Sequence, residues 1–337
     1  MNNALKRHTE FTFFRPFRKW PVYFFSLLIF LIIAGCNKEN QAPQLTANYD
    51  IYMGGTMEDK AVYWKNGVPA TLNDSGIVKS IIVIGPDIYA CGAVNKLRAP
   101  FATYWKNGKE IPLEKQNQSA ALGMAVQGND IYCVGNISGP DGELNAVCWK
   151  NGIANYLPLG SKSSANGITV IGDQVYISGE TYGHYTDSAF VWKNNQKVFF
   201  GANGSMEAAG FNGIDTFFIG ELNASPTTWV NNKITKLFNN GFVVTMTFSG
   251  TDKYFGGGVR PNLNDNYAAI WKNDSLTILT DQYTHSAVLG LTFAGTDLYA
   301  VGNASDEFIG VSPVYWKNGV MVKLGSNGQV TSIAISH

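Results

Sequence analysis

The chain has 337 residues, of which 25 are basic and 25 are acidic, and charged residues make up only 15% of it. Proteins that bind nucleic acids usually carry an excess of basic residues that neutralise phosphates. This chain has no such excess, so no nucleic-acid partner is expected. Short apolar runs separated by glycine and asparagine turns are typical of a β-rich protein.

The first 35 residues have the pattern of a secretory signal peptide. A basic stretch over residues 6–19 precedes an apolar run from Val22 to Ala34. An uncleaved membrane anchor is the alternative, but the run is shorter than the roughly 20 apolar residues that span a bilayer. The run ends in Ile33-Ala34-Gly35-Cys36, which resembles the lipobox of bacterial lipoproteins.

That resemblance implies cleavage before Cys36, acylation of its thiol, and a membrane partner held through the lipid. Asn37 stands where an aspartate would resemble an inner-membrane retention signal, which favours an outer-membrane lipoprotein facing the periplasm or the cell surface. Residues 36–44 are then a lipid-anchored linker. Removing residues 1–35 takes away five basic residues and one acidic residue, so the remaining chain carries a net charge of −4.

Seven copies of one tryptophan motif follow, 37 to 45 residues apart. The tryptophans are Trp64, Trp105, Trp149, Trp192, Trp229, Trp271 and Trp316. A period of this length with short apolar runs is typical of a β-propeller with one blade per repeat. We therefore predict an all-β fold, a monomeric seven-bladed β-propeller over residues 45–337.

Each repeat is expected to supply four strands, named a to d. Strand b carries a tyrosine, or Phe217 in the fifth copy, and strand c ends in a form of Ala-x-x-Trp-Lys-Asn-Gly. Asn-Gly, as in Asn66-Gly67, is a strong hairpin signal because both residues tolerate positive φ. Tyrosine and tryptophan at fixed repeat positions indicate packing between blades.

Strand a is expected to be innermost, because it carries a small residue at one position of every repeat. These residues are Ser80, Gly123, Gly167, Ala208, Thr245, Gly290 and Ser332. Small side chains suit the place where seven strands converge. The chain begins in a strand b near Tyr52 and ends in a strand a after Thr331, so the C-terminal strand should pair into the N-terminal blade and close the ring.

The b–c and d–a loops vary in length and chemistry, which makes their face the candidate binding surface. The candidate residues are Glu180, Tyr182, His184, Tyr185, Glu221, Arg260 and His285, with Tyr283 nearby. They would form an aromatic, carboxylate-bearing patch suited to a sugar or a peptide, with Arg260 placed to pair with either glutamate. The alternative is ordinary loop polarity exposed to solvent.

Stronger catalytic motifs are absent from the sequence. It contains no nucleophile elbow, His-Glu-x-x-His, P-loop or dinucleotide glycine motif, and no zinc-ligand spacing, so neither a cofactor nor a metal is expected. Residues 262–266 are similar to a calcium loop but lack its acidic ligands.

Two cysteines of the third repeat give a separate structural expectation. If Gly135 pairs with Ala146, Cys133 lies opposite Cys148, where a disulfide could form in an oxidising compartment. The alternative is a pair of small buried apolar side chains.

The repeats resemble the Trp-Lys-Asn-Gly repeats of uncharacterised bacterial propeller lipoproteins, and more distantly kelch units and extracellular Ala-Phe-x-Trp repeats. The resemblance specifies a fold and no activity. We favour a non-enzymatic, membrane-anchored binding or scaffold module for an envelope protein or a glycan. The alternatives are a polysaccharide hydrolase or lyase that uses Glu180 and Glu221, and a structural component of the cell envelope.

Overall fold

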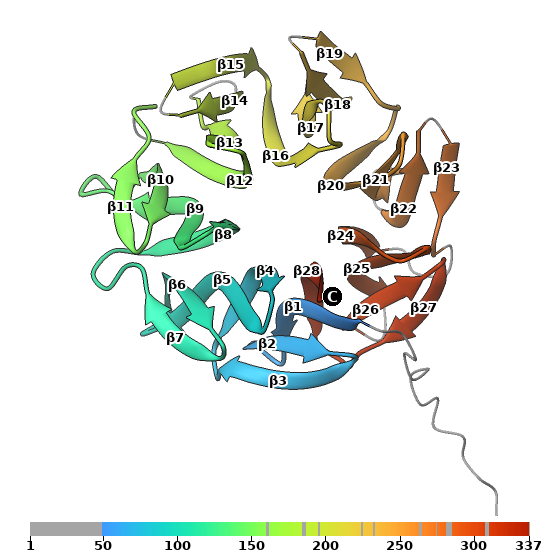
Figure 1. The fold of residues 1–337 in the computed structure, drawn as a ribbon, viewed down its shortest axis with the longest axis horizontal. Coiled ribbons are helices and arrows are strands. Elements are labelled where there is room, and N and C mark those ends of the chain that lie inside the picture. The colour runs from blue at the N-terminus through green and yellow to red at the C-terminus, as the bar shows by residue number, and fades with distance from the viewer. Residues whose placement is uncertain are drawn as a thin grey trace, which may run out of the picture. The chain divides into compact units, whose positions relative to one another are not determined.

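The computed structural model describes residues 49–159, 162–183, 187–194, 196–223, 225–231, 233–262, 265–273, 275–280, 285–306 and 310–336. In this part of the chain, 28 strands form seven four-stranded antiparallel sheets arranged around a ring (Figure 1). The predicted all-β seven-bladed propeller is therefore confirmed. None of these residues belongs to a helix long and apolar enough to cross a membrane.

The blades follow one another along the chain, each with its strands in order from the centre outward. Blade 1 contains β28 (Gly328–Ser336), β1 (Asp50–Met57), β2 (Lys60–Lys65) and β3 (Val68–Asn73). Blade 2 contains β4 (Gly76–Ile84), β5 (Asp87–Lys96), β6 (Ala99–Lys106) and β7 (Lys109–Pro112). Blade 3 contains β8 (Ser119–Gln127), β9 (Asp130–Ser138), β10 (Leu144–Lys150) and β11 (Ile153–Tyr156). Blade 4 contains β12 (Ser163–Ile171), β13 (Gln174–Thr181), β14 (Ser188–Lys193) and β15 (Gln196–Ala202).

The remaining three blades have the same order. Blade 5 contains β16 (Gly204–Phe211), β17 (Thr216–Leu222), β18 (Ser225–Val230) and β19 (Lys233–Lys236). Blade 6 contains β20 (Gly241–Ser249), β21 (Asp252–Val259), β22 (Tyr267–Lys272) and β23 (Ser275–Ile278). Blade 7 contains β24 (His285–Ala294), β25 (Asp297–Asp306), β26 (Gly310–Lys317) and β27 (Val320–Lys323).

The innermost strands crowd together at the positions where the sequence keeps small residues. A Cβ atom on Gly167 would lie 2.8 Å from the carbonyl oxygen of Glu207 in the next blade, and one on Gly123 would lie 3.2 Å from that of Asn166. Backbone at this distance leaves no room for a larger side chain. The placement of strand a at the centre is confirmed, and its cause is this contact between neighbouring blades (Figure 1).

A β-bulge recurs in every innermost strand, immediately before the small residue, and the sequence analysis did not predict it. The bulged residues are Lys79, Leu122, Asn166, Glu207, Val244, Leu289 and Thr331. A bulge bends its strand and redirects a side chain. In blade 1 the Thr331 hydroxyl donates to the carbonyl oxygens of Gly54, at 3.0 Å, and of Val78 in blade 2, at 2.6 Å.

The core lies between blades, as the fixed aromatic positions predicted. All seven repeat tryptophans are buried. Tyr132 and Cys148 of blade 3, for example, pack in one cluster with Phe190 and Trp192 of blade 4. Burying an aromatic side chain of this size contributes about 1.5–3 kcal/mol or more to folding. The packing therefore joins each blade to the next.

The two ends of the chain meet in blade 1. β28 pairs antiparallel with β1, with Ile333 opposite Met53 and Ala334 opposite Tyr52. This is the ring closure that the sequence predicted, and it removes the free edges of the first and last strands.

The Trp-Lys-Asn-Gly motif also builds a polar latch between the a–b and c–d turns of one blade. In blade 2 the Asn107 amide donates to Asp87 at 2.7 Å and accepts the backbone N–H of Ile88 at 2.8 Å. Lys106 pairs with Asp87 at 2.9 Å and lies over the ring of Tyr89. Asn107 itself has a φ of 51°, as expected for the first residue of an Asn-Gly hairpin.

The complete latch recurs in five blades. Its aspartate–lysine pairs are Asp50–Lys65, Asp87–Lys106, Asp130–Lys150, Asp252–Lys272 and Asp297–Lys317. The motif thus has a structural explanation, and in these five blades its lysine neutralises the aspartate of the a–b turn.

The latches predict how stability depends on pH. Hydrogen bonds from lysine and asparagine side chains lower the pKa of the five latch aspartates. A lowered folded-state pKa contributes stability above the unfolded value of about 3.9, and this contribution is lost as pH falls through the folded-state pKa. We expect the latch contribution to stay constant between pH 5 and 8 and the thermal midpoint to fall steeply below pH 4. Replacing all five aspartates with asparagine should flatten the acid limb, and an unchanged limb would contradict the latch as its origin.

The arrangement of Cys133 and Cys148 differs from the sequence expectation. Gly135 pairs with Val147, so Cys133 lies opposite Trp149 and Cys148 lies opposite Val134. The predicted register is wrong by one residue, because a tight turn over residues 139–143 sets the hairpin. The two thiols consequently face opposite sides of the sheet. Cys91, Cys133 and Cys148 are all free and buried.

Candidate functional site

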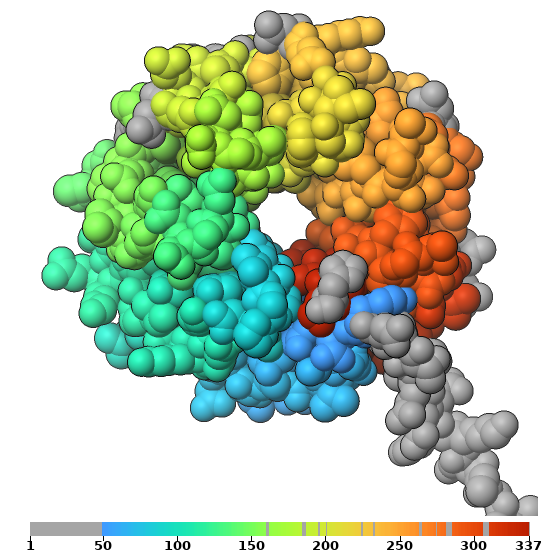
Figure 2. Space-filling view, in the orientation of Figure 1, coloured from blue at the N-terminus to red at the C-terminus, as the bar shows by residue number. Residues whose placement is uncertain are grey.

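Charges distinguish the two faces of the ring. On the face of the a–b and c–d turns, the latch carboxylates are neutralised by lysines of their own blades. On the opposite face, where the variable b–c and d–a loops lie, carboxylates gather at blades 4 and 5. The candidate site therefore lies on this second face, near the inner strands. These strands surround the central opening visible in Figure 2.

Glu180 is held at the end of β13 by two donors. The Tyr182 hydroxyl donates to its Oε1 at 3.1 Å, and the Asn166 amide donates to the same oxygen at 3.3 Å. Asn166 is the bulged residue of β12, and its own oxygen accepts the Ser164 hydroxyl at 3.0 Å. A further hydrogen bond, from the Asn136 amide to Ser164, extends this chain into blade 3.

Glu207 is the bulged residue of β16 in blade 5, and it is the functional candidate that the sequence analysis missed. The Ser205 hydroxyl donates to its Oε1 at 2.6 Å. Ser205 in turn lies opposite Glu221 of β17, just as Ser164 lies opposite Glu180 in blade 4. The equivalent repeat positions thus bring three carboxylates toward one inner rim. The acidic patch is defined here as Glu180, Glu207 and Glu221.

The charges of these three groups act on one another. Burial raises the pKa of Glu207, and the charges of Glu180 and Glu221 raise it further, against the opposing effect of the Ser205 hydrogen bond. Burial and the negative charge of Glu180 raise the pKa of Tyr182 to about 12. Both shifts express the cost of collecting negative charge where solvent is partly excluded.

Among the described residues, no lysine or arginine forms an ion pair with the acidic patch. The ion pairs of the described residues involve other carboxylates. Two buried hydroxyls of the same two blades, Ser178 Oγ and Thr227 Oγ1, also have no hydrogen-bond partner. The same repeat positions hold valine in blade 3, at Val134 and Val147.

The predicted patch is only partly brought together. Glu180, Tyr182 and Glu221 gather around Glu207, whereas Arg260 of blade 6 donates to Asn266 at 3.2 Å and its guanidinium lies over the ring of Phe242. Arg260 pairs with neither glutamate. His285 begins β24 in blade 7 and is exposed. His184, Tyr185 and Tyr283 lie outside the described residues, as do Cys36 and the signal-peptide and linker boundaries.

Removing the charge of Glu207 should stabilise the fold at neutral pH. A carboxyl whose pKa is raised on folding costs free energy wherever it is ionised, so its contribution falls as pH rises above the unfolded value of about 4.3. We expect Glu207→Gln to have a higher thermal midpoint than the parent at pH 8 and no gain at pH 4. Glu110→Gln is the control, because Glu110 already pairs with Lys96. A lower midpoint for Glu207→Gln at pH 8 would contradict the patch electrostatics.

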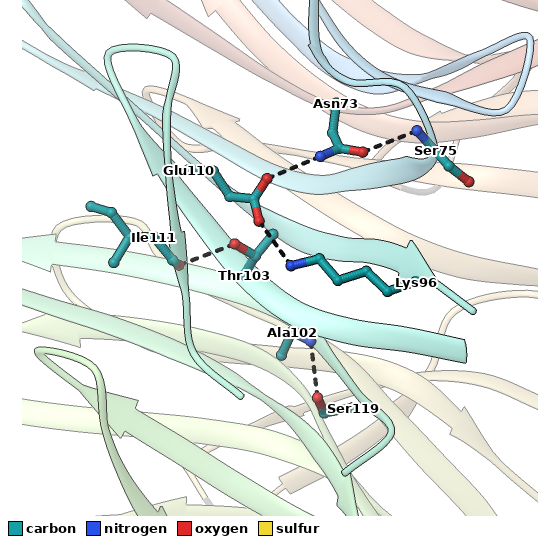
Figure 3. A network of polar contacts seen from close by, with 8 residues as sticks. All are labelled: Asn73, Ser75, Lys96, Ala102, Thr103, Glu110, Ile111 and Ser119. Atoms are coloured by element: carbon teal, nitrogen blue, oxygen red, sulfur yellow. Dashed lines mark hydrogen bonds and ion pairs between the residues drawn. The ribbon is translucent and has the colours of Figure 1, made fainter. Parts of the chain in front are cut away.

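Blades 1 and 2 contain a contrasting polar network on the variable side. Glu110 accepts the Asn73 amide at 2.9 Å and pairs with Lys96 at 3.4 Å (Figure 3). Below it, the Ser119 hydroxyl accepts the backbone N–H of Ala102 and joins blade 3 to blade 2 (Figure 3). Because Lys96 neutralises Glu110 here, we interpret this network as a structural contact between blades.

Two hollows lie away from the acidic patch. A groove of about 690 Å³ opens between blades 3 and 4, over Trp192 and beside Tyr156. Cys148, which lines the groove, occupies a position where blades 1, 2 and 7 carry a tyrosine. A second hollow of about 470 Å³ lies between blades 1 and 2, beside Asp59 and Arg98. None of the predicted binding residues that the structure describes lines either hollow.

The described residues contain no group of three or more histidine, cysteine, aspartate or glutamate side chains arranged to hold a metal ion. The functional roles discussed below for the acidic patch are direct binding of a ligand and exchange of a proton with it.

No protein-family model and no curated protein sequence matches the chain. Among solved structures, a puromycin-hydrolyzing peptidase of Mycobacterium tuberculosis is similar, with a TM-score of 0.53 and 11% identity over 83% of this chain and 53% of that one. TolB from Acinetobacter baumannii has a TM-score of 0.50 and 12% identity over 73% of this chain and 66% of that one. The chain thus spans about half of the peptidase and just under two thirds of TolB. At these identities the likeness shows the propeller fold alone.

Proposed function

We propose that the protein is a membrane-anchored extracytoplasmic binding module that holds its ligand at the acidic patch of blades 4 and 5. The observation that carries this proposal is the set of three carboxylates with which no lysine or arginine in the described part of the chain forms an ion pair. An uncompensated cluster of this kind raises the free energy of the fold, and a ligand that supplies hydrogen bonds or positive charge lowers it.

The ligand classes that fit are an envelope protein and a glycan. The free carboxylate oxygens accept hydrogen bonds from sugar hydroxyls or from a basic side chain, and Tyr182 adds an aromatic surface beside them. The propeller keeps these groups on packed inner strands and strand ends, so they need little reordering when a ligand binds.

The cellular location proposed for this module rests on the lipobox-like segment that ends in Cys36. Acylation of Cys36 would hold the propeller at the outer membrane through the linker of residues 36–44. Cys36→Ser should abolish incorporation of a labelled fatty acid and release the protein from the membrane fraction. Retention of label in Cys36→Ser would contradict this anchor.

Binding should depend on the patch and on no other carboxylates. The detergent-solubilised protein would be screened on glycan and basic-peptide arrays, and each hit quantified by calorimetry. We expect Glu180→Gln combined with Glu207→Gln to weaken binding at least tenfold, about 1.4 kcal/mol. The matched control is Glu58→Gln, which removes an exposed carboxylate of blade 1 paired with Lys60. Equal loss in the control, or none in the double variant, would remove the patch as the binding site.

A second candidate is a hydrolase or lyase acting on polysaccharide. The observation that favours it is the raised pKa of Glu207 next to Glu180, since a protonated and an ionised carboxyl are the pair that glycoside cleavage uses. Turnover of a polysaccharide panel that vanishes in Glu207→Gln would establish this alternative. Absence of both binding and turnover would leave a structural component of the envelope.

A further inference from the structure

Two thiols face each other across the interface between blades 2 and 3. Cys91 lies on β5 of blade 2 and Cys133 on β9 of blade 3, and both belong to one buried cluster with Tyr89 and Trp149. The Cys91 thiol lies close enough to raise the pKa of Cys133, and the exposed fractions of the two side chains are 0% and 1%. They are 42 positions apart in sequence, so only the packing of the two blades brings them together.

The same juxtaposition recurs around the ring, which shows that it is a property of the repeat. The equivalent pairs, one residue from each of two neighbouring blades, pack in common clusters. They are Val134 with Ile177, Ile219 with Phe255, and Val301 with Met53. These two positions share a cluster at four of the seven interfaces, and between blades 2 and 3 both of them are cysteine.

Cys148 does not share this arrangement. It lies beside Trp149 on β10 but belongs to the cluster between blades 3 and 4, on the other side of the sheet. Successive residues of a strand point to opposite faces, so Cys148 cannot approach Cys133 without breaking the strand pairing. It is therefore a natural internal control.

We propose that Cys91 and Cys133 form a disulfide that joins blade 2 to blade 3, with Cys148 left as a free thiol. The oxidant is a disulfide-bearing oxidoreductase or a small-molecule disulfide. One S–S bond of the oxidant breaks and one forms in the protein. The two protein thiols lose two protons and two electrons, and the oxidant leaves as two thiols.

The burial of the pair determines when the bond forms. Burial, together with the adjacent Cys91 thiol, raises the pKa of Cys133 well above its usual range, so the folded protein holds little of the thiolate that attacks a disulfide. Exchange consequently takes place before blades 2 and 3 close on each other. Once they close, the same packing shields the bond from reductants.

Peptide mapping tests the connectivity directly. The full chain, purified in detergent, is unfolded, refolded with oxidised and reduced glutathione, and alkylated under denaturing conditions. Cleavage after lysine alone leaves Cys133 and Cys148 in one peptide, so cleavage after glutamate is added to cut at Glu143. We expect peptide 80–96 linked to peptide 116–143, an intact mass about 2 Da lower than that of the reduced chain, and full alkylation of peptide 144–150.

Alanine variants separate this bond from its competitors. Cys148→Ala should keep the linked peptides and the higher unfolding midpoint that oxidation gives, whereas Cys91→Ala and Cys133→Ala should lose both. Alkylation of all three thiols after refolding in oxidised glutathione would overturn the proposal, and so would a peptide that links Cys133 to Cys148. Because the oxidant is supplied, the result is independent of where the protein resides and of its ligand.

Discussion

Deleting residues 329–337 is expected to abolish cooperative unfolding of the propeller. The deletion removes nearly all of β28, with the buried Val330, and leaves one side of β1 without a partner. Blades 7 and 2, which pack against blade 1, lose the inner strand between them. Net stabilities of domains are only about 5–15 kcal/mol, so we expect most of it to be lost. The measurements are calorimetry and light scattering, because an exposed strand edge promotes association.

The control for this truncation removes only residue 337, which lies beyond the last residue of β28. Its thermal transition should match that of the parent. A single sharp transition of unchanged midpoint in the longer deletion would show that the ring does not depend on its closing strand.

The second large effect is expected at the centre of the ring. A Cβ on Gly167 would lie 2.7 Å from Ser178 Oγ and 2.8 Å from the carbonyl oxygen of Glu207, closer than real Cβ atoms approach. Gly167→Val adds two further methyl groups to this contact, and the backbones of blades 4 and 5 would have to separate. Overpacking at such a site costs about 3 kcal/mol or more, which urea-induced unfolding measures.

The matched control uses the same repeat position in blade 6. Thr245 already carries a β-branched side chain there, so Thr245→Val adds no bulk and only replaces a hydroxyl with a methyl group. We expect it to cost less than Gly167→Val. Equal effects of the two substitutions would argue against crowding between blades as the reason for the small residues.

The fold could be predicted from the sequence because the repeat encodes it many times over. Seven tryptophans set the number of blades, and a chain that starts in one strand and ends in its missing neighbour specifies closure at Tyr52 and Ala334. Asn-Gly turns and small residues each recur at fixed positions. Each of these patterns reflects a physical constraint that recurs around the ring: a turn that needs positive φ, or a position where neighbouring blades leave little space.

The candidate site was harder to predict from the sequence, because it depends on β-bulges and on the exact length of turns. A bulge adds one residue to a strand without changing its apolar pattern, so strict alternation could not single out Glu207. The turn over residues 139–143 shifted the hairpin register by one position and placed Cys133 opposite Trp149. Arg260 was expected near the glutamates because loops of one face were treated as one surface, whereas its contacts with Phe242 and Asn266 hold it within blade 6.

The position of β1 in its sheet has a mechanical consequence. β1 has β28 on one side and β2 on the other, so it is an inner strand of blade 1. Tension applied to the chain just before Asp50 loads both rows of backbone hydrogen bonds in shear, and they must break together. An edge strand would be peeled away one bond at a time. A propeller pulled from this end should therefore resist drag far better than one pulled from an outer strand.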